Sequence, residues 1–117
     1  MKLEKLTYTL KNSWSKDTCF ETQSEEWGSD NPSLGQCYIT ALIVNDYFGG
    51  FIVKSKTSTG VNHYWNRLGG VDIDLTKEQF SRDVKFFDKE IVSRDNLSIN
   101  SRYIKLKERV EKFLTTS

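Results

Sequence analysis

Hydrophobic residues at the start of the chain recur at the spacing of a helix. Leu3, Leu6 and Leu10 follow one another at intervals of three and four residues, and Trp14 extends the same stripe. This period places the four side chains on one face, as in an amphipathic helix.

The pattern stops after this stripe, and residues 13–34 are mostly polar. They include Pro32, which is the only proline, and the turn formers Gly28, Asp30 and Asn31. Loops of this length are uncommon in compact domains and are often functional. We expect an ordered loop that Trp14, Phe20 and Trp27 anchor to the body of the domain.

The most hydrophobic stretch is residues 36–48, QCYITALIVNDYF. Its β-branched residues favour a strand. Thirteen residues are long for a strand, however, and Gly49-Gly50 supplies a C-terminal stop for a helix. We predict a helix that is apolar on most sides and therefore buried, followed by a strand over residues 51–56.

Two short segments on either side of Gly69-Gly70 have the pattern of a β-hairpin, residues 61–68 and 71–75. Thr76 and Gln79 have the spacing of a helix capping box, which predicts a short helix through Phe80.

A last amphipathic period spans residues 101–114. Helices and strands are interleaved with a hairpin, so we expect one α+β domain over residues 1–117. Its central helix would pack on a small antiparallel sheet made of the three predicted strands.

Composition and charge narrow the classes of partner. The chain has 117 residues with 17 basic and 16 acidic side chains, a balance that gives no field to attract nucleic acid. No apolar run approaches the roughly 20 residues that span a bilayer, and the first residues lack a secretory h-region. With only two cysteines, Cys19 and Cys37, we expect unbonded thiols in a cytoplasmic protein without nucleic-acid or membrane partners.

Cys37 gives the first indication of chemistry, because it opens the predicted buried helix. A thiol in the first turn of a helix lies near free N–H groups and the positive end of the helix dipole, which favour the nucleophilic thiolate. The same N–H groups can hold an oxyanion once the thiolate attacks a carbonyl. Taken alone, Cys37 could equally be a small buried hydrophobic residue.

His63 is the only histidine, and it begins the first strand of the hairpin. With Gly69-Gly70 as the loop, Trp65 faces Asp74, and the period of two places His63 and Asp74 on one face. Such diagonal neighbours lie roughly 7–8 Å apart at the backbone. An aspartate in this position could orient the imidazole and stabilise its charged form.

Each of these residues also has an ordinary structural interpretation. His63 could be a structural histidine, and Asp74 could cap the helix predicted at Thr76. Cys19, Cys37, His63 and Asp74 could together bind zinc, but the paired ligand spacings of zinc sites are absent. We expect neither a metal nor another cofactor.

Several segments resemble the YunG family of small bacterial proteins. They are WSKDT at 14–18, PSLGQC at 32–37, TALIVNDYFGG at 40–50, HYWNRLGG at 63–70 and DIDLTKEQF at 72–80. The resemblance implies a shared fold.

More distantly, a cysteine at a helix start, then a histidine, then an aspartate on neighbouring strands is similar to the order in papain-like and transglutaminase-like enzymes. This similarity implies a core of that kind. In papain-like enzymes a glutamine several residues before the cysteine helps to form the oxyanion hole. Here Gln36 is immediately adjacent to Cys37, Asn31 lies six residues before it, and we take Gln36 as the candidate.

We therefore predict thiol-mediated acyl chemistry: amide hydrolysis, deamidation or acyl transfer on an amide- or acyl-bearing substrate, which could be a protein. Cys37 would be the nucleophile, His63 the general base and acid, and Asp74 the residue that orients the imidazole. The walls of the cleft would come from Trp14, Trp27 and Trp65. The alternative is a non-catalytic module that binds a small ligand or a protein, in which the triad is only structural.

Overall fold

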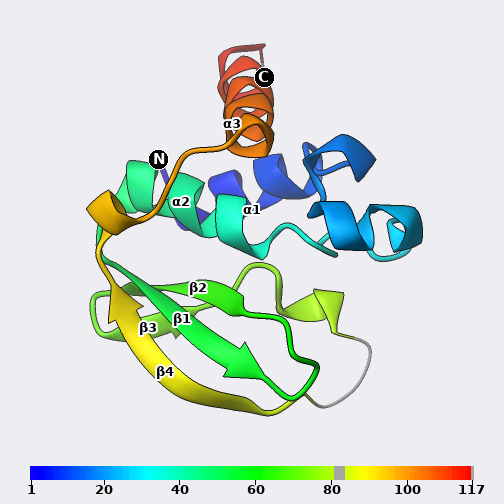
Figure 1. Ribbon diagram of the computed structural model, residues 1–117. Helices are drawn as coiled ribbons and strands as arrows, with labels where there is room; N and C mark the ends of the chain where they lie inside the picture. The colour runs from blue at the N-terminus through cyan, green and yellow to red at the C-terminus, as the bar shows by residue number, and fades with distance from the viewer. Residues whose placement is uncertain (81–83, 117) are drawn as a thin grey trace.

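The computed structural model describes residues 1–80 and 84–116, and over these residues three α-helices lie on one side of a four-stranded antiparallel sheet (Figure 1). The helices are α1 (Leu3–Lys11), α2 (Cys37–Phe48) and α3 (Ser101–Thr116). The strands are β1 (Phe51–Thr57), β2 (His63–Leu68), β3 (Val71–Ile73) and β4 (Phe86–Val92), in the spatial order β3-β2-β1-β4. The predicted α+β class is confirmed.

Helix α2 is the centre of the hydrophobic core. Six consecutive residues from Ile39 to Val44 are buried, as the all-round apolar pattern predicts. On one side α2 contacts the apolar faces of α1 and α3, which contribute Leu6 and Leu106 to the same cluster. On the other side it packs on the sheet, where Asn66 Nδ2 donates a hydrogen bond of 3.0 Å to the Ala41 carbonyl.

The hairpin has the predicted register, because Leu68 pairs with Val71 and Arg67 pairs with Asp72. Its strands are shorter than predicted: β2 begins at His63 and β3 ends at Ile73. Helix α1 ends at Lys11, before Trp14. Helix α2 ends at Phe48, where Gly49 takes a φ of 69° that favours glycine.

The long polar segment contains two 3-10 helices, η1 (Lys16–Thr18) and η2 (Glu21–Glu26), joined by turns. Trp14 anchors it as predicted, since its buried indole donates a hydrogen bond of 3.0 Å to Thr40 on α2. Trp27 instead closes the loop on itself by donating to the Pro32 carbonyl. Phe20 is 41% exposed and does not anchor the loop in the core.

The structure differs from the sequence predictions at two places in the second half of the chain. Strand β4 was not predicted, because its hydrophobic residues are interrupted by Asp88-Lys89-Glu90 and it lies exposed at the edge of the sheet. Its pairing with β1 shifts register between Lys54 and Lys56, and Asp88 has a φ of 53°. The predicted capped helix is a single 3-10 turn, η3 (Lys77–Gln79), without a side-chain cap.

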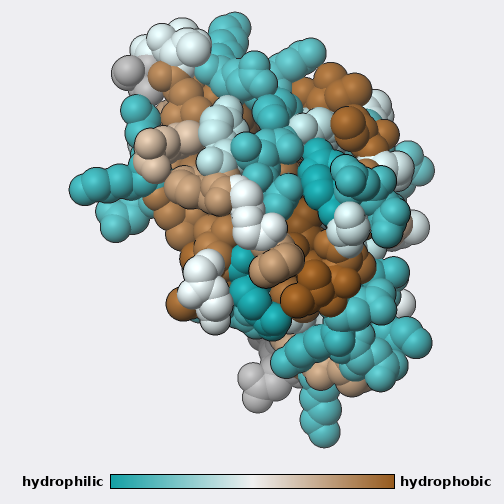
Figure 2. Space-filling model, turned by 90° about the vertical axis from the view of Figure 1, so that its left-hand side faces the viewer, coloured by the Kyte–Doolittle hydropathy of each residue, from teal (hydrophilic) through white to brown (hydrophobic). Residues whose placement is uncertain are grey.

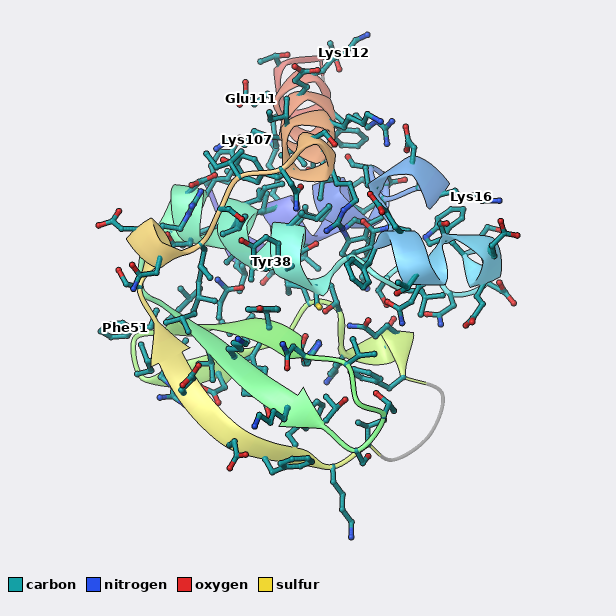
Figure 3. The ribbon with its side chains drawn as sticks, in the orientation of Figure 1. Lys16, Tyr38, Phe51, Lys107, Glu111 and Lys112 are labelled. Atoms are coloured by element: carbon teal, nitrogen blue, oxygen red, sulfur yellow. The ribbon has the colours of Figure 1, made fainter. Side chains whose placement is uncertain are left out.

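The surface mixes polar and hydrophobic side chains. Figure 2 shows hydrophobic patches separated by hydrophilic residues on the face at the left of Figure 1, and Phe51, labelled at this edge in Figure 3, is 56% exposed. Among the described residues, no helix combines the length and the hydropathy that crossing a bilayer requires.

Candidate functional site

Cys37 is the first residue of α2, which confirms the predicted position of the thiol at the start of the helix. The preceding Gly35 makes this entry possible, with a φ of 71° and a carbonyl that accepts a hydrogen bond of 3.0 Å from Phe20 N. A Cβ at Gly35 would meet Cys19 Sγ and would lie 2.8 Å from Phe20 N. Only glycine therefore allows the loop to pack this closely before the helix begins.

His63 and Asp74 form the predicted hydrogen-bonded pair, with 2.6 Å between His63 Nε2 and Asp74 Oδ2. The imidazole is 1% exposed and the carboxylate is 20% exposed. The second carboxylate oxygen of Asp74 accepts hydrogen bonds from Thr76 N (3.1 Å) and Thr76 Oγ1 (3.2 Å). Asp74 thus holds both the turn that follows β3 and the histidine ring.

The charge balance around His63 favours the protonated ring. Burial lowers its pKa, but the hydrogen bond to Asp74, the nearby Cys37 side chain and the negative charge of Asp74 raise it more, to about 9 from an ordinary 6.5. Asp74 occupies Nε2, so a proton from the Cys37 thiol has to go to Nδ1, the nitrogen that Gln79 Nε2 faces at 3.3 Å. The arrangement can therefore stabilise a thiolate–imidazolium pair.

Gln79 joins the histidine to the entry of α2. Its Nε2 lies 3.3 Å from His63 Nδ1 and 3.2 Å from Thr76 Oγ1, and its Oε1 accepts a hydrogen bond of 3.4 Å from Gly35 N. The amide can donate to Nδ1 while the imidazole is neutral, and it has to move aside when Nδ1 takes up a proton. Gln79 therefore fixes the distance between the ring and the segment that carries Cys37.

Aromatic rings enclose the imidazole on the side away from α2. Phe86 on β4 stacks on it with 5.4 Å between ring centroids, and Phe80 contacts it edge-on at 5.0 Å. Trp65, the next residue on the same face of β2, lies 5.6 Å away. These rings keep bulk water from His63, which strengthens its interactions with Asp74 and Cys37.

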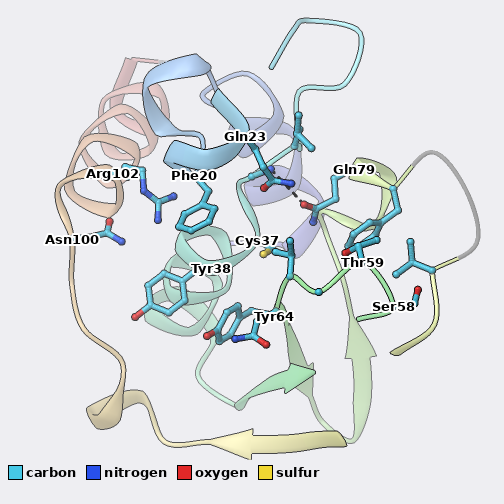
Figure 4. Close-up of a pocket in the computed structure, with 17 residues that line it drawn as sticks. Phe20, Gln23, Cys37, Tyr38, Ser58, Thr59, Tyr64, Gln79, Asn100 and Arg102 are labelled. Carbon is cyan, nitrogen blue, oxygen red and sulfur yellow. Dashed lines mark hydrogen bonds between the residues drawn. The ribbon is translucent and has the colours of Figure 1, made fainter. Parts of the chain in front are cut away.

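A pocket of about 930 Å³ opens at the N-terminal end of α2 (Figure 4). Its walls come from the η2 segment, the start of α2, the loop at residues 58–62, the Gln79 turn and the start of α3. Cys37 lines it, and Tyr38 and Tyr64 form an edge-to-face pair with 4.9 Å between centroids. Figure 3 shows Tyr38 lying between α2 and the sheet. The thiol is thus accessible from a cavity large enough for a small molecule or a peptide end.

Gln36 does not face this pocket. Its fully buried side chain accepts a hydrogen bond of 2.8 Å from Thr18 Oγ1 and donates one of 3.1 Å to the Ser15 carbonyl. Adjacent helical residues diverge by about 100° around the axis, so Gln36 points away from the direction of Cys37. Its side chain holds η1 in place, which corrects the predicted oxyanion role.

The three tryptophans do not line the pocket either. Trp14 is in the core with α2, and Trp27 is half-buried within its own loop. Trp65 is 7% exposed and packs behind His63. The prediction that they wall the cleft is corrected: the aromatic wall is made by Phe20, Tyr38, Tyr64 and Phe80.

Gln23, Gln79 and Arg102 are among the polar residues of the pocket that the sequence did not identify as site residues. Gln79 was interpreted as a helix cap, and Gln23 and Arg102 lie in a polar loop and on an amphipathic helix, where such residues are common. The one available signal was the length of the loop that contains Gln23.

Both cysteines are free thiols in the structure, in agreement with the prediction. Cys19 is buried, and burial raises the pKa of its thiol, which makes it the less reactive of the two. Among the described residues, no three side chains of the types His, Cys, Asp and Glu are grouped as a metal site would require.

Comparisons with known proteins identify the family. The family model described as "YunG protein" matches residues 2–115. The uncharacterised protein YunG of Bacillus subtilis (strain 168) is 38% identical over 84 residues, which cover 72% of this chain and 68% of the relative. No solved structure matches the chain. The chain therefore belongs to the YunG family.

Proposed function

We propose that this protein is a thiol-dependent hydrolase or acyltransferase in which Cys37, His63 and Asp74 act as a catalytic triad. The observation that carries the proposal is the hydrogen bond of 2.6 Å between His63 and Asp74, on a ring whose pKa the Cys37 side chain also raises. A structural histidine needs no thiol at the mouth of a pocket, whereas a cysteine nucleophile needs an adjacent base that a third group orients.

The proposed reaction begins when the Cys37 thiol gives its proton to His63 Nδ1 and the thiolate attacks the carbonyl carbon of an amide or ester. The oxyanion that forms would accept hydrogen bonds from free N–H groups at the start of α2. Collapse breaks the bond to the leaving group, which takes the proton from Nδ1 and leaves a thioester on Cys37. Water or an amine then attacks the thioester, gives its proton to His63 and restores the thiol.

Gln23 replaces Gln36 as the proposed side-chain donor of the oxyanion hole. It lines the same pocket as Cys37, and Figure 4 shows it beside Gln79 at the rim above the thiol. Within the described residues its amide group makes no hydrogen bond, so its Nε2 is free to donate to a substrate.

A papain-like or transglutaminase-like core is part of the same proposal. A helix that begins with the cysteine and packs on an antiparallel sheet supports it, with the histidine at the start of β2 and the aspartate directly after the adjacent β3. Two unbonded thiols fit a reducing compartment, so we propose that the enzyme acts in the cytoplasm.

The second candidate is a non-catalytic pocket that binds a small ligand or a protein segment. The observation in its favour is the burial of His63, which is 1% exposed beneath Phe80 and Phe86. A general acid must reach the leaving group, and a ring covered in this way must do so through the Cys37 side of the pocket alone.

An acyl-donor screen read by intact mass separates the two candidates. The protein is incubated with activated esters and amides of varied acyl group, and each adduct is mapped to Cys37 or Cys19. The triad predicts an acyl adduct on Cys37 that forms and turns over, with Asp74→Asn slowing the reaction and His63→Gln abolishing turnover. A binding module predicts no selective adduct on Cys37 in a folded protein, and this result would lead us to abandon the enzyme proposal.

A further inference from the structure

The described residues that line the Cys37 pocket include a positive charge but no negative one. Among its described lining residues, Arg102 carries the one permanent charge, and none is an aspartate or a glutamate. The other lining residues are aromatic, aliphatic or neutral polar. Among the described residues, a ligand that fills the pocket therefore meets one guanidinium, on the wall formed by the start of α3 (Figure 4).

Arg102 forms no ion pair with a described residue, unlike the other described arginines. Arg67, Arg94 and Arg109 each form an ion pair with an aspartate. Arg102 instead donates from NH1 to the Thr18 carbonyl at 3.3 Å and lies 5.4 Å from the ring centroid of Phe20.

Burial of an unpaired charge is unfavourable. Burial lowers the pKa of the half-buried Arg102, although the charge of Glu21 offsets part of this, and an ion pair normally offsets the cost. The remaining N–H groups of the guanidinium have no acceptor among the described residues. An anion on the ligand would supply the missing partner.

Asn100 supplies a second donor beside the guanidinium. Its Oδ1 accepts a hydrogen bond of 2.8 Å from Tyr103 N and so caps α3, which leaves Nδ2 free to donate. Both residues line the pocket, and Figure 4 shows them on the wall opposite Ser58 and Thr59, with Cys37 between the two walls.

We propose that Arg102 and Asn100 form a carboxylate-binding subsite of the Cys37 pocket, so that the substrates are amides or esters that also carry a free carboxylate. The assignment of a substrate class rests on the proposed function, whereas the subsite itself does not. One positive charge matches a monoanion, and the planar fork of the guanidinium matches the two oxygens of a carboxylate. A phosphate dianion would call for more positive charge than this wall offers.

The test uses two alkylating reagents that differ only in charge, N-chloroacetylglycine and N-chloroacetylglycinamide. We expect Cys37 to react about tenfold faster with the acid than with the neutral amide, because a hydrogen-bonded ion pair holds the acid in the pocket. Arg102→Gln removes this preference, and Arg102→Lys, which keeps the charge without the fork, retains part of it. Lys105→Gln is the matched control, since it removes one positive charge from an exposed position on the same helix.

Binding to the Cys37→Ser protein tests the subsite independently of thiol chemistry. N-acetylglycine should bind and raise the melting temperature, N-acetylglycinamide should not, and Arg102→Gln should abolish the difference. Equal behaviour of the acid and the amide in both assays overturns the subsite, as does a preference that Lys105→Gln loses as fully as Arg102→Gln. A sluggish Cys37 that still binds N-acetylglycine through Arg102 contradicts the proposed reaction and leaves the subsite standing.

Discussion

The two faces of the sheet bury different kinds of side chain. On the face toward the helices, Ile52 and Leu68 pack against the apolar side chains of α2. On the far face, Val53 and Trp65 are buried beside five polar side chains of β1, β2 and the following turn: Ser55, Thr57, His63, Thr76 and Gln79. Burial of apolar surface explains the first face, because each such side chain adds about 1.5–3 kcal/mol.

Burial of apolar surface does not explain the polar side chains on the other face. A buried polar group is unfavourable unless it is hydrogen-bonded, and a fully bonded one adds only about 1 kcal/mol. An apolar layer would stabilise the sheet at least as well. Ser55 and Thr57 bond to β4 and to the loop after β1, whereas Thr76 and Gln79 join Asp74 in one network around His63. This part of the face is organised around the ring.

The largest effect on stability should come from the apolar face. Leu42 is fully buried in α2, and Leu42→Ala leaves a cavity that should reduce the free energy of unfolding by about 2–5 kcal/mol. Denaturant unfolding measures the loss. The rate at which iodoacetamide labels Cys37 in the folded fraction should stay unchanged. A labelling rate that falls together with stability would show that the two faces do not have separate roles.

The packing of the loop at the entry to α2 is tested by comparing Gly35→Ala with Gly49→Ala. Both glycines have a positive φ near 70°, but a Cβ meets nothing within 4 Å at Gly49 and meets Cys19 and Phe20 N at Gly35. The positive φ should strain both variants by about 1–3 kcal/mol. Gly35→Ala should lose at least about 1 kcal/mol more, because the entry to α2 must shift. Equal unfolding free energies would show that this entry is not closely packed.

The polar face should respond to pH. The pKa of His63 is about 9 in the folded protein and lies above its ordinary value of 6.5, so the folded state binds this proton more tightly than the unfolded chain. The resulting stabilisation is complete below pH 6.5 and disappears as the pH rises through 9. Denaturant unfolding at pH 6 and pH 9.5 should show a loss of stability in the wild type that His63→Gln does not show. Parallel losses in the two proteins would mean that Asp74 and Cys37 do not hold the proton.

The smallest effect is expected at Trp27, which belongs to neither face. Trp27→Phe removes the hydrogen bond to the Pro32 carbonyl, worth about 1 kcal/mol, and leaves the pocket unchanged. Labelling kinetics of Cys37 should match the wild type. A clear change in the labelling rate would return Trp27 to the cleft wall that the sequence first suggested.

The sequence predicted the elements that depend on periodicity. The apolar run fixed α2 and its start at Cys37, and Gly69-Gly70 fixed the hairpin register from which the His63–Asp74 pair follows. Strand β4 was missed because an edge strand exposed to solvent carries no alternating pattern, and a bulge further disturbs its spacing.

The details of the pocket depend on side-chain direction, which residue type alone does not specify. Gln36 is adjacent to Cys37 in the sequence yet turns toward Thr18, and Trp65 shares a face with His63 but packs behind the ring. Gln79 and Arg102 reach the site from a turn and a distant helix. Their roles depend on tertiary contacts that no local pattern contains.

The pH dependence of iodoacetamide labelling at Cys37, in the wild type and in His63→Gln, tests the central claim most directly. A thiolate paired with an imidazolium should react at pH 6 far faster than Cys19, and His63→Gln should slow Cys37 by about tenfold or more at this pH. The difference should vanish above pH 9, where the ring is neutral. Superimposable profiles for the two folded proteins would contradict the triad and leave the pocket as a binding site.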